Sequence, residues 1–341
     1  MIKTALIIGV TGQDGAYLSE LLISKGYMVY GTHRLRSNNF SRLKSLGLYR
    51  HERLKLMDLE LSSSDDCIAA ISNIQPDEVY NLASHSFVGD SVSNPVGTIA
   101  TSGMSTVYLL DAIRQYSHHS KFFQACSSEM FGNVDNDIQD ENSRFNPRNP
   151  YGVAKLLSYY TAINYRDVYD VFACVGILYN HESPLRGLDF LTSKVTSSAV
   201  KIKLGIQERL EIGNMESYRD WGYAKEYVEA MYLMMQQDRS DTFILSTGIL
   251  TSVREFIRIS FEAVGIALEF RGEGVNEYAI DTATGNVVVE VNPKFYRPTE
   301  QHTLLGNPKK AEKLLGWRAK TDVRELAEMM VNNYIKEYQE L

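Results

Sequence analysis

The sequence contains no apolar run close to the roughly 18 residues that a membrane-spanning helix requires. Its first residues also lack the basic and then apolar pattern of a secretory signal, and the short apolar run at 5–8 leads into glycines. Cysteine is scarce: Cys67, Cys126 and Cys174 are widely spaced in apolar stretches and form no metal-binding pattern. We therefore expect a cytoplasmic protein with reduced core thiols and no metal site.

An excess of positive charge is also missing, since the formal net charge is −7. This balance disfavours non-specific nucleic-acid binding, which depends on a basic surface. It remains compatible with an anionic small substrate, because a few arginines suffice to bind phosphates locally. The length of 341 residues and the ordinary hydrophobic content predict a globular chain of one large domain or two modest ones.

The first half alternates apolar strand-like runs with helical patterns, which predicts a doubly wound, Rossmann-type parallel sheet covered by helices on both faces. The strands are expected at 4–9, 28–32, 54–57, 78–82, 121–125 and 171–177, and the helices at 17–25, 64–74, 98–114 and 151–169. We expect residues 1–180 to form this domain, with some later segments crossing back to it.

Beyond about residue 180 the pattern loosens, which indicates a smaller mixed α/β domain over 181–341. Helices are expected at 190–204, 223–236, 253–264 and 323–338, and strands at 209–212, 242–246, 269–271 and 287–291. The stretch 273–287 is punctuated by glycine and is expected to be a mobile surface insertion.

A glycine-rich turn joins the first strand to the first helix, with the spacing G-x-x-G-x-x-G. Glycines let backbone amides approach a pyrophosphate at the N-terminus of a helix, so the turn predicts a dinucleotide site; a packing turn is the alternative. The residues expected to contact the cofactor here are Gly9, Thr11, Gly12, Gln13, Asp14 and Gly15.

The end of the second strand favours NADP over NAD. Arg34 and Arg36 stand where an acidic residue would bind the ribose 2′-hydroxyl of NAD, and arginine suits a 2′-phosphate instead. Both arginines have the alternative of being solvated surface charges. Asp58 and Leu59, after the third strand, are expected at the adenine, although Asp58 is also a plausible turn residue.

Tyr151 precedes Lys155 by four residues on a predicted helix, so both side chains share one face. The lysine charge favours the phenolate and makes the tyrosine a usable base. Glu129, just upstream, adds a second acid/base group and indicates a reaction that goes beyond alcohol oxidation. The alternative for Tyr151 and Lys155 is that both are ordinary residues on a helix surface. The alternative for Glu129 is that it is a solvated carboxylate in a loop.

Several motifs in order resemble the extended short-chain dehydrogenase/reductase family and, within it, the GDP-mannose 4,6-dehydratases. They cover nearly the whole chain and lie at 9–18, 76–83, 180–184, 219–222, 296–298 and 304–308. The resemblance implies an NADP-dependent lyase that converts a GDP-sugar to its 4-keto-6-deoxy form. The implied catalytic residues are Ser127, Glu129, Tyr151 and Lys155.

The resemblance also implies further contacts. Leu82, Ala83 and Ser84 would line the cofactor site at the end of the fourth strand, and Ser86 would lie near the substrate together with Ser127 and Glu129. The nucleotide would be bound by Asn180, Lys194, Arg219, Arg297 and Glu300, with Arg186 a weaker candidate. His181 and Glu182 are interpreted as structural supports.

Some positions depart from the family pattern. Ser127 stands where a threonine is usual, residues 81–87 differ from the usual loop, and Leu185 and Ser193 stand where arginines are common. These changes are expected near substrate or subunit contacts and leave the sugar open, with a GDP-linked manno-heptose as an alternative. A nucleotide-sugar 4-epimerase or reductase and a cofactor-binding regulatory protein without turnover are the rival hypotheses.

The basic segment 34–42 resembles a loop that reaches a neighbouring subunit's cofactor in this family. A homo-oligomer is therefore expected, a tetramer or else a dimer. The alternative is a flexible loop ordered only by bound NADP.

Overall fold

The computed structural model describes residues 2–35, 37, 39–84, 88–132, 138–296 and 304–339. The chain divides into two compact units. Unit 1 comprises residues 1–179, 224–245 and 306–318, and unit 2 comprises residues 180–223, 246–305 and 319–341.

Unit 1 is built on a seven-stranded sheet whose adjacent strands are all parallel. In spatial order its strands are β11 (Thr242–Leu245), β6 (Ala173–Leu178), β5 (Lys121–Ser127), β4 (Glu78–Asn81), β1 (Thr4–Ile8), β2 (Met28–His33) and β3 (Leu54–Asp58). The order reverses between β1 and β4, where a doubly wound sheet binds its ligands. The predicted Rossmann-type sheet is confirmed, and β11 joins it from far along the chain.

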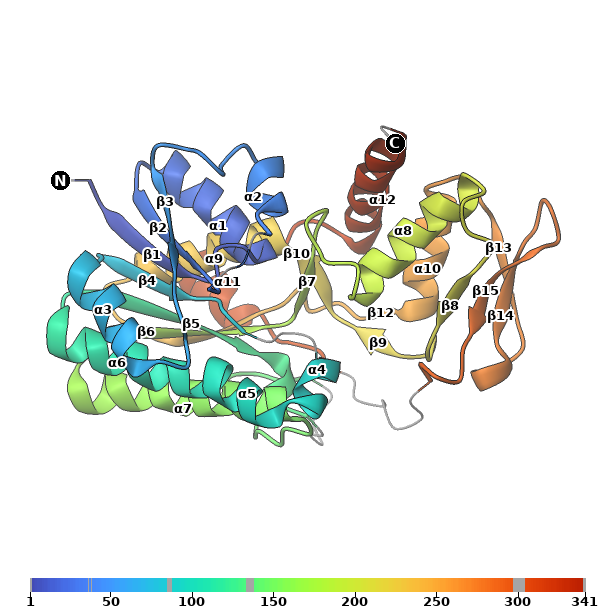
Figure 1. Ribbon diagram of the computed structural model, residues 1–341. Helices are drawn as coiled ribbons and strands as arrows, with labels where there is room; N and C mark the ends of the chain where they lie inside the picture. The colour runs from blue at the N-terminus through green and yellow to red at the C-terminus, as the bar shows by residue number, and fades with distance from the viewer. Residues whose placement is uncertain are drawn as a thin grey trace. The chain divides into compact units, whose positions relative to one another are not determined.

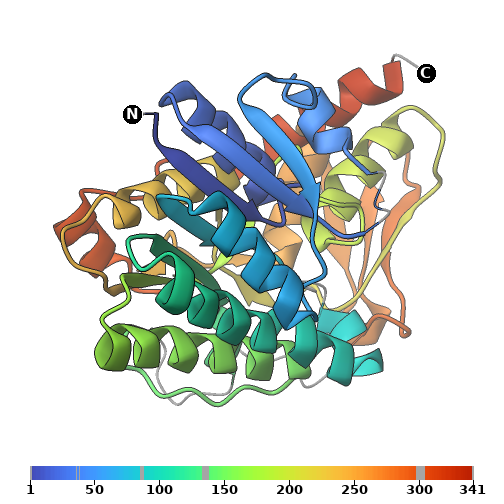
Figure 2. The ribbon, with the colours of Figure 1, turned by 60° about the vertical axis from the view of Figure 1, so that its left-hand side comes forward.

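Helices cover both faces of this sheet (Figures 1 and 2). One layer contains α3 (Ser64–Ile74), α5 (Pro95–Ile99), α6 (Ser105–Tyr116) and α7 (Pro150–Tyr169); the other contains α1 (Gln13–Ser24), α9 (Ala224–Met235) and α11 (Lys309–Leu315). The two short helices α2 (Ser41–Ser45) and α4 (Val88–Ser93) complete the unit. The ends follow local rules, since Ser63 caps α3 by accepting from the Asp66 amide at 3.2 Å.

The helix expected over 98–114 is interrupted, which corrects the sequence prediction. A π-helical turn, Ala100–Met104, lies between α5 and α6. Gly103 packs closely on α7, because a Cβ there would lie 2.9 Å from Cδ2 of Leu157. The Ser102 carbonyl accepts from Ser158 Oγ at 2.7 Å, so a side chain of α7 supplies a hydrogen-bond donor to a backbone carbonyl within the widened turn.

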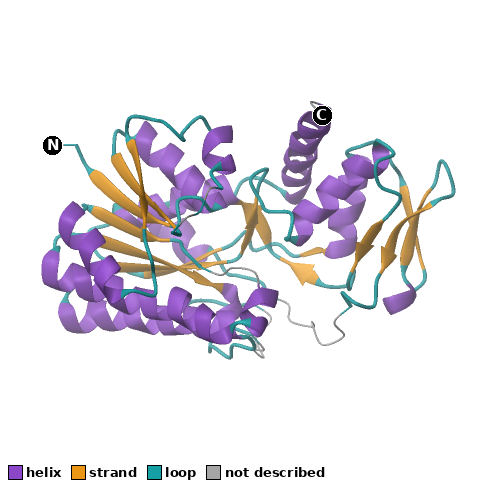
Figure 3. Ribbon diagram, viewed as in Figure 1, coloured by secondary structure: helices purple, strands orange, loops and turns teal. Residues whose placement is uncertain are grey.

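Unit 2 contains a four-stranded sheet, two small two-stranded sheets and three packed helices (Figure 3). The larger sheet has the order β13 (Leu268–Arg271), β14 (Tyr278–Asp281), β15 (Val287–Val291) and β8 (Leu210–Ile212). The small sheets pair β10 (Trp221–Tyr223) with β7 (Asn180–Glu182) and β12 (Thr251–Ser252) with β9 (Tyr218–Arg219). The helices are α8 (Leu191–Lys203), α10 (Val253–Glu262) and α12 (Val323–Gln339). Their buried faces share one core with the larger sheet.

The stretch 273–287 was expected to be a surface insertion, and it forms part of the larger sheet instead. It supplies β14, which pairs antiparallel with both β13 and β15, and Ala279 at its centre is fully buried. Gly272, Gly274 and Gly285 have φ between 59° and 75° and form the turns at the strand ends. The glycines thus mark hairpin turns, and the strand between them is too short to show a clear alternation.

Two composition-based expectations can be compared with the structure. All three cysteines are free and buried, which confirms their place in the core. Burial raises the pKa of Cys126 to about 12, so it stays a neutral thiol. In the part of the chain that the structure describes, no helix combines the length and the apolar composition that a bilayer crossing requires.

Candidate active site

The glycine-rich turn forms a close-packed cradle at the start of α1. Gly9 has a φ of 90°, and a Cβ on Gly15 would lie 2.4 Å from the Gly9 carbonyl oxygen, so other residues would force the turn open. Gly12 is the N-cap residue of α1 and places no side chain over the first-turn amides. The cradle therefore fits the pyrophosphate of a dinucleotide, which these amides and the helix dipole favour.

The end of β4 lies directly against this cradle. A Cβ on Gly9 would lie 3.0 Å from the Ala83 backbone, and the Leu82 amide donates to the Ile8 carbonyl at 3.1 Å. Ser84 Oγ donates to Ser102 Oγ at 3.0 Å, which connects this strand end to the π turn. The structure thus brings the cofactor residues expected after β1 and after β4 to one place.

The ends of β2 and β3 form the side of the cradle expected to hold the adenosine. His33 Nδ1 lies 3.1 Å from Asp58 Oδ1, and the Leu59 amide donates to the His33 carbonyl at 3.0 Å. Arg34 follows directly. Arg42, at the end of the basic segment 34–42, donates from its Nη1 to the Thr11 carbonyl of its own chain at 3.1 Å. Sequence analysis considered Arg42 only beside a neighbouring subunit's cofactor, because its contact with the glycine-rich turn of the same chain depends on how the loop folds.

The end of β5 positions the first two catalytic candidates. Ser127 is its last residue, and its Oγ accepts from the Glu129 amide at 3.2 Å, which starts a short 3₁₀ turn over Ser128–Met130. Glu129 Oε2 accepts from Asn149 Nδ2 at 2.8 Å. Glu129 is therefore held at both its backbone and its side chain.

Tyr151 and Lys155 lie one turn apart at the N-terminal end of α7, and both are buried. The Lys155 ammonium donates to the Ala125 carbonyl at 2.7 Å and lies 5.8 Å from the centre of the Tyr151 ring. Burial lowers the pKa of Lys155 to about 8, while Cys126 and Asp14 act in the opposite direction. At neutral pH the protonated form still predominates, and its charge can favour the Tyr151 phenolate.

The two pairs of catalytic candidates, Ser127 with Glu129 and Tyr151 with Lys155, are joined by close backbone packing. A Cβ on Gly152 would lie 2.7 Å from the Glu129 carbonyl oxygen, so the 3₁₀ turn and the first turn of α7 are in contact. Asn149 bridges them, since its Oδ1 also accepts from the Gly152 amide at 2.8 Å as the N-cap of α7. Sequence reasoning missed Asn149, although an asparagine directly before a proline is a recognisable helix start.

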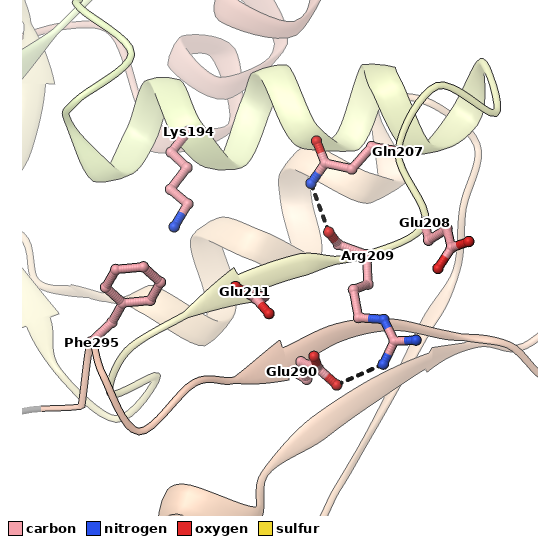
Figure 4. A pocket seen from close by; sticks show the side chains of 7 residues that line it. All are labelled: Lys194, Gln207, Glu208, Arg209, Glu211, Glu290 and Phe295. Atoms are coloured by element: carbon pink, nitrogen blue, oxygen red, sulfur yellow. Dashed lines mark hydrogen bonds and ion pairs between the residues drawn. The ribbon is translucent and has the colours of Figure 1, made fainter.

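In unit 2, Lys194 and Phe295 line an open cavity of 520 Å³ together with Gln207, Glu208, Arg209, Glu211 and Glu290 (Figure 4). The Lys194 ammonium lies 4.2 Å from the centre of the Phe295 ring, and burial lowers the pKa of Lys194. Arg209 is paired with Glu290 at 2.9 Å, so Lys194 is the cation that faces the Phe295 end of the cavity.

The other candidates of unit 2 lie on short strands or are engaged. Asn180 and Arg219 are half-buried on β7 and β9, and Arg219 Nη1 donates to the Tyr218 carbonyl at 2.7 Å. Arg186 stacks on Phe190 at 3.5 Å and pairs with the buried Glu182 at 3.0 Å. The Arg186 guanidinium therefore already has a local partner and is not left free to bind a phosphate through two parallel hydrogen bonds.

Ser193, where an arginine is common in the family, is buried and faces the interior of unit 2. Its Oγ donates to the Arg186 carbonyl at 2.9 Å and accepts from the Tyr334 hydroxyl at 3.2 Å.

Several predicted residues lie outside the described part of the chain, namely Arg36, Ser86, Arg297 and Glu300. Within the described ranges, histidine, cysteine, aspartate and glutamate side chains form no group of three or more suited to a metal ion.

Comparison with known proteins places these features in a family. The family described as GDP-mannose 4,6 dehydratase matches residues 6–330. GDP-mannose 4,6-dehydratase of Sinorhizobium fredii is 46% identical over 96% of this chain and 95% of its own, and GDP-mannose 4,6 dehydratase of Homo sapiens is 42% identical over 97% and 91%.

Solved structures share the fold at low identity. The dTDP-glucose 4,6-dehydratase of Bacillus anthracis in complex with NAD superposes with a TM-score of 0.81 at 17% identity, covering 99% of this chain and 98% of its own. RMD from Pseudomonas aeruginosa complexed with NADPH gives 0.77 at 18% identity, covering 98% and 99%. At these identities the solved structures show only a shared fold, whereas the sequence matches show the family. This chain belongs to the GDP-mannose 4,6-dehydratase family.

Proposed function

We propose that this protein catalyses the 4,6-dehydration of a GDP-linked sugar, with GDP-mannose as the first substrate to test. The observation that carries the proposal is the packing of Glu129 beside the first turn of α7, which holds Tyr151 and Lys155. A tyrosine base with a lysine partner suits oxidation of an alcohol, and the adjacent carboxylate suits elimination. Membership of the family supports the GDP-sugar.

The residues would act in sequence. Tyr151, favoured as phenolate by Lys155, takes the proton of the C4 hydroxyl, and Ser127 donates a hydrogen bond to O4 as charge shifts. A nicotinamide held by the glycine-rich cradle would supply the acceptor for the C4 hydride and the donor of the hydride to C6. Glu129 takes the C5 proton, which the C4 ketone has made acidic, and returns a proton as the C6 hydroxyl leaves as water. Tyr151 then gives the proton that it took from O4 to C5, so both bases are restored and the net change is loss of one water.

The cofactor is proposed to be NADP, bound by the cradle and by Arg34 and Arg36 at the 2′-phosphate, with Asp58 and Leu59 at the adenine. Solved structures of the same fold contain NADPH or NAD, which supports a nicotinamide dinucleotide. Arg42, held at the Thr11 carbonyl, adds a positive charge on that side. Denaturing the purified protein and identifying the released nucleotide tests this; release of NAD alone would overturn it.

The nucleotide is proposed to contact Asn180, Lys194, Arg219, Arg297 and Glu300. The cavity around Lys194 and Phe295 supports this, because an aromatic face suits a base and an ammonium suits phosphate. A homo-oligomer, a tetramer or a dimer, is also proposed and is tested by light scattering on the purified protein. Its cytoplasmic location stays a prediction.

The test of function is incubation with GDP-mannose and, separately, with the GDP-linked manno-heptose, followed by mass spectrometry. Loss of one water from GDP-mannose is the expected result. Loss from the heptose alone would keep the chemistry and change the substrate, as the departures at residues 81–87 allow. Interconversion at C4 without loss of water would indicate an epimerase or reductase. No change with either sugar, with the nicotinamide bound, would indicate a protein without turnover.

A further inference from the structure

Asn149 uses both ends of its side-chain amide. Its oxygen accepts from the Gly152 amide at 2.8 Å and so caps α7, and its nitrogen donates to Glu129 Oε2 at 2.8 Å. The cap fixes the start of the helix that holds Tyr151. The donated bond fixes the carboxylate of the second acid/base group. One side chain thus touches both halves of the catalytic group.

The choice of asparagine is informative. Serine and aspartate cap helices about as well as asparagine does, because capping needs only a side-chain oxygen. Neither can accept from Gly152 and also donate to a carboxylate in this geometry: an ionised aspartate has no hydrogen to give, and a serine hydroxyl is shorter. Capping alone therefore does not require the amide nitrogen, and the bond to Glu129 does.

The backbone around Asn149 restricts where the amide can lie. Pro150 follows as the first helical residue and has a fixed φ. Two residues further on, Gly152 packs against the Glu129 carbonyl. With the helix start and the 3₁₀ turn in contact, the amide spans a defined gap between them. A carboxylate held by a bond to a neutral donor keeps its orientation without losing its charge.

We propose that Asn149 is a positioning residue for Glu129: its amide holds the carboxylate in the orientation from which Glu129 exchanges the C5 proton. This rests on the proposed function, since it assigns a task to Glu129 within that reaction. Asn149 touches no reacting atom and acts through Glu129. Its removal should therefore slow water elimination and leave C4 oxidation nearly intact.

The test separates the cap from the donated bond. Asn149→Ser and Asn149→Asp keep a capping oxygen and lose the bond to Glu129, whereas Asn149→Ala loses both. Ser63→Ala, which removes the cap of α3 in the same unit, is the matched control for loss of a cap alone. Each variant is measured for thermal stability, for reduced nicotinamide in a single turnover and for loss of water from the GDP-sugar.

We expect Asn149→Ser to keep the melting temperature of the natural protein and to form reduced nicotinamide at nearly the natural rate. Its loss of water should slow about tenfold or more, the usual effect of losing a hydrogen bond to a charged group, so reduced nicotinamide accumulates. Asn149→Asp should be slower still, because two carboxylates then face each other. Asn149→Ala should combine the slow elimination with a lower melting temperature like that of Ser63→Ala.

Natural rates of water loss in both Asn149→Ser and Asn149→Asp would overturn the proposal and leave a helix cap only. A crystal structure of Asn149→Ser gives a second reading that needs no turnover: the Glu129 carboxylate should move from its place, and an unmoved carboxylate would also overturn it. If the natural protein removes water from neither GDP-sugar, the proposed function fails instead, and this structural comparison still decides whether Asn149 positions Glu129.

Discussion

The two units hold their candidate site residues in different ways. In unit 1 the candidate catalytic residues Lys155 and Tyr151 are buried, at 2% and 9% exposure, whereas Glu129 is half-buried; Lys155 and Glu129 have close hydrogen-bond partners. In unit 2 Asn180, Lys194 and Arg219 are half-buried, and Lys194 lies at an open cavity. The groups proposed to do chemistry are thus held by close hydrogen bonds, whereas Lys194, proposed to bind the nucleotide, lies at an open cavity.

This difference predicts where a substitution acts. Loss of a fixed group in unit 1 should remove an interaction made in the transition state and lower kcat. Loss of a cation in unit 2 should remove binding that substrate and transition state share, and so raise KM. A kcat effect from a unit 2 cation, or a KM effect alone from a unit 1 group, would contradict this difference.

Tyr151→Phe should give the largest effect. Loss of the phenolic oxygen removes the base for the C4 hydroxyl, and we expect kcat to fall by about 10³-fold or more. No reduced nicotinamide should form in a single turnover followed by its absorbance. Formation at the natural rate would show that another group takes this proton.

Glu129→Gln should lower the rate of water loss by about 10²- to 10³-fold while C4 oxidation continues. Reduced nicotinamide should therefore accumulate, so that this one variant distinguishes oxidation at C4 from the loss of water across C5 and C6. Glu328→Gln on the exposed side of α12 serves as the matched control. Dehydration by Glu129→Gln at the natural rate would contradict the assignment.

Burial of Lys155 should have a measurable cost in stability. Its pKa falls from the ordinary 10.5 to about 8, so between these pH values the unfolded chain binds a proton that the folded chain has released. Lys155 should therefore contribute a rise in the free energy of unfolding across this window, of up to about 3 kcal/mol, while the raised pKa values of the buried thiols Cys67, Cys126 and Cys174 act in the opposite direction. Denaturant titrations of the cofactor-free protein at several pH values measure it.

The matched comparison for this pH effect is Lys155→Met against Lys55→Met, a lysine with an exposed side chain. Between about pH 8 and 10.5 the first variant should lack the contribution of Lys155, so its free energy of unfolding should change with pH differently from that of the natural protein, and the second variant should follow the natural protein. An unchanged slope in Lys155→Met would mean that another group titrates there.

Lys194→Met should give the smallest effect, a KM for the GDP-sugar raised about tenfold with kcat changed by less than about twofold. Lys203→Met, an exposed lysine of the same helix, is the control. Steady-state kinetics with varied GDP-sugar measure both constants. A fall in kcat as large as that of Glu129→Gln would erase the distinction between the two units.

The sequence was sufficient for the long elements of unit 1. Its strands are apolar runs between turn residues, and helices such as Ser64–Ile74 match the predicted range because a capping serine precedes them. It failed where the structure depends on packing. The π turn at Ala100–Met104 follows from close contact with α7, and strands of two or three residues, such as β9 and β10, are too short to show a period.

The candidate site shows the same limit. The spacing of Tyr151 and Lys155 on a helix was enough to place both on one face. The positions of Arg42 and Asn149 were not, because each makes its contact with a segment 20 or more residues away in the sequence. Long-range neighbours of this kind follow from the assembled fold and not from local pattern.

The division of the chain into units also affects its synthesis on the ribosome. Unit 1 takes its last strand, β11, from Thr242–Leu245 and its last helix from Lys309–Leu315. Until Thr242–Leu245 has been made, β6 has no partner on one side and presents an open edge. At about 5–20 residues per second, residues 180–245 take roughly 3 to 13 s to emerge. The nascent protein therefore spends this interval as an incomplete sheet that must be kept from pairing with other chains.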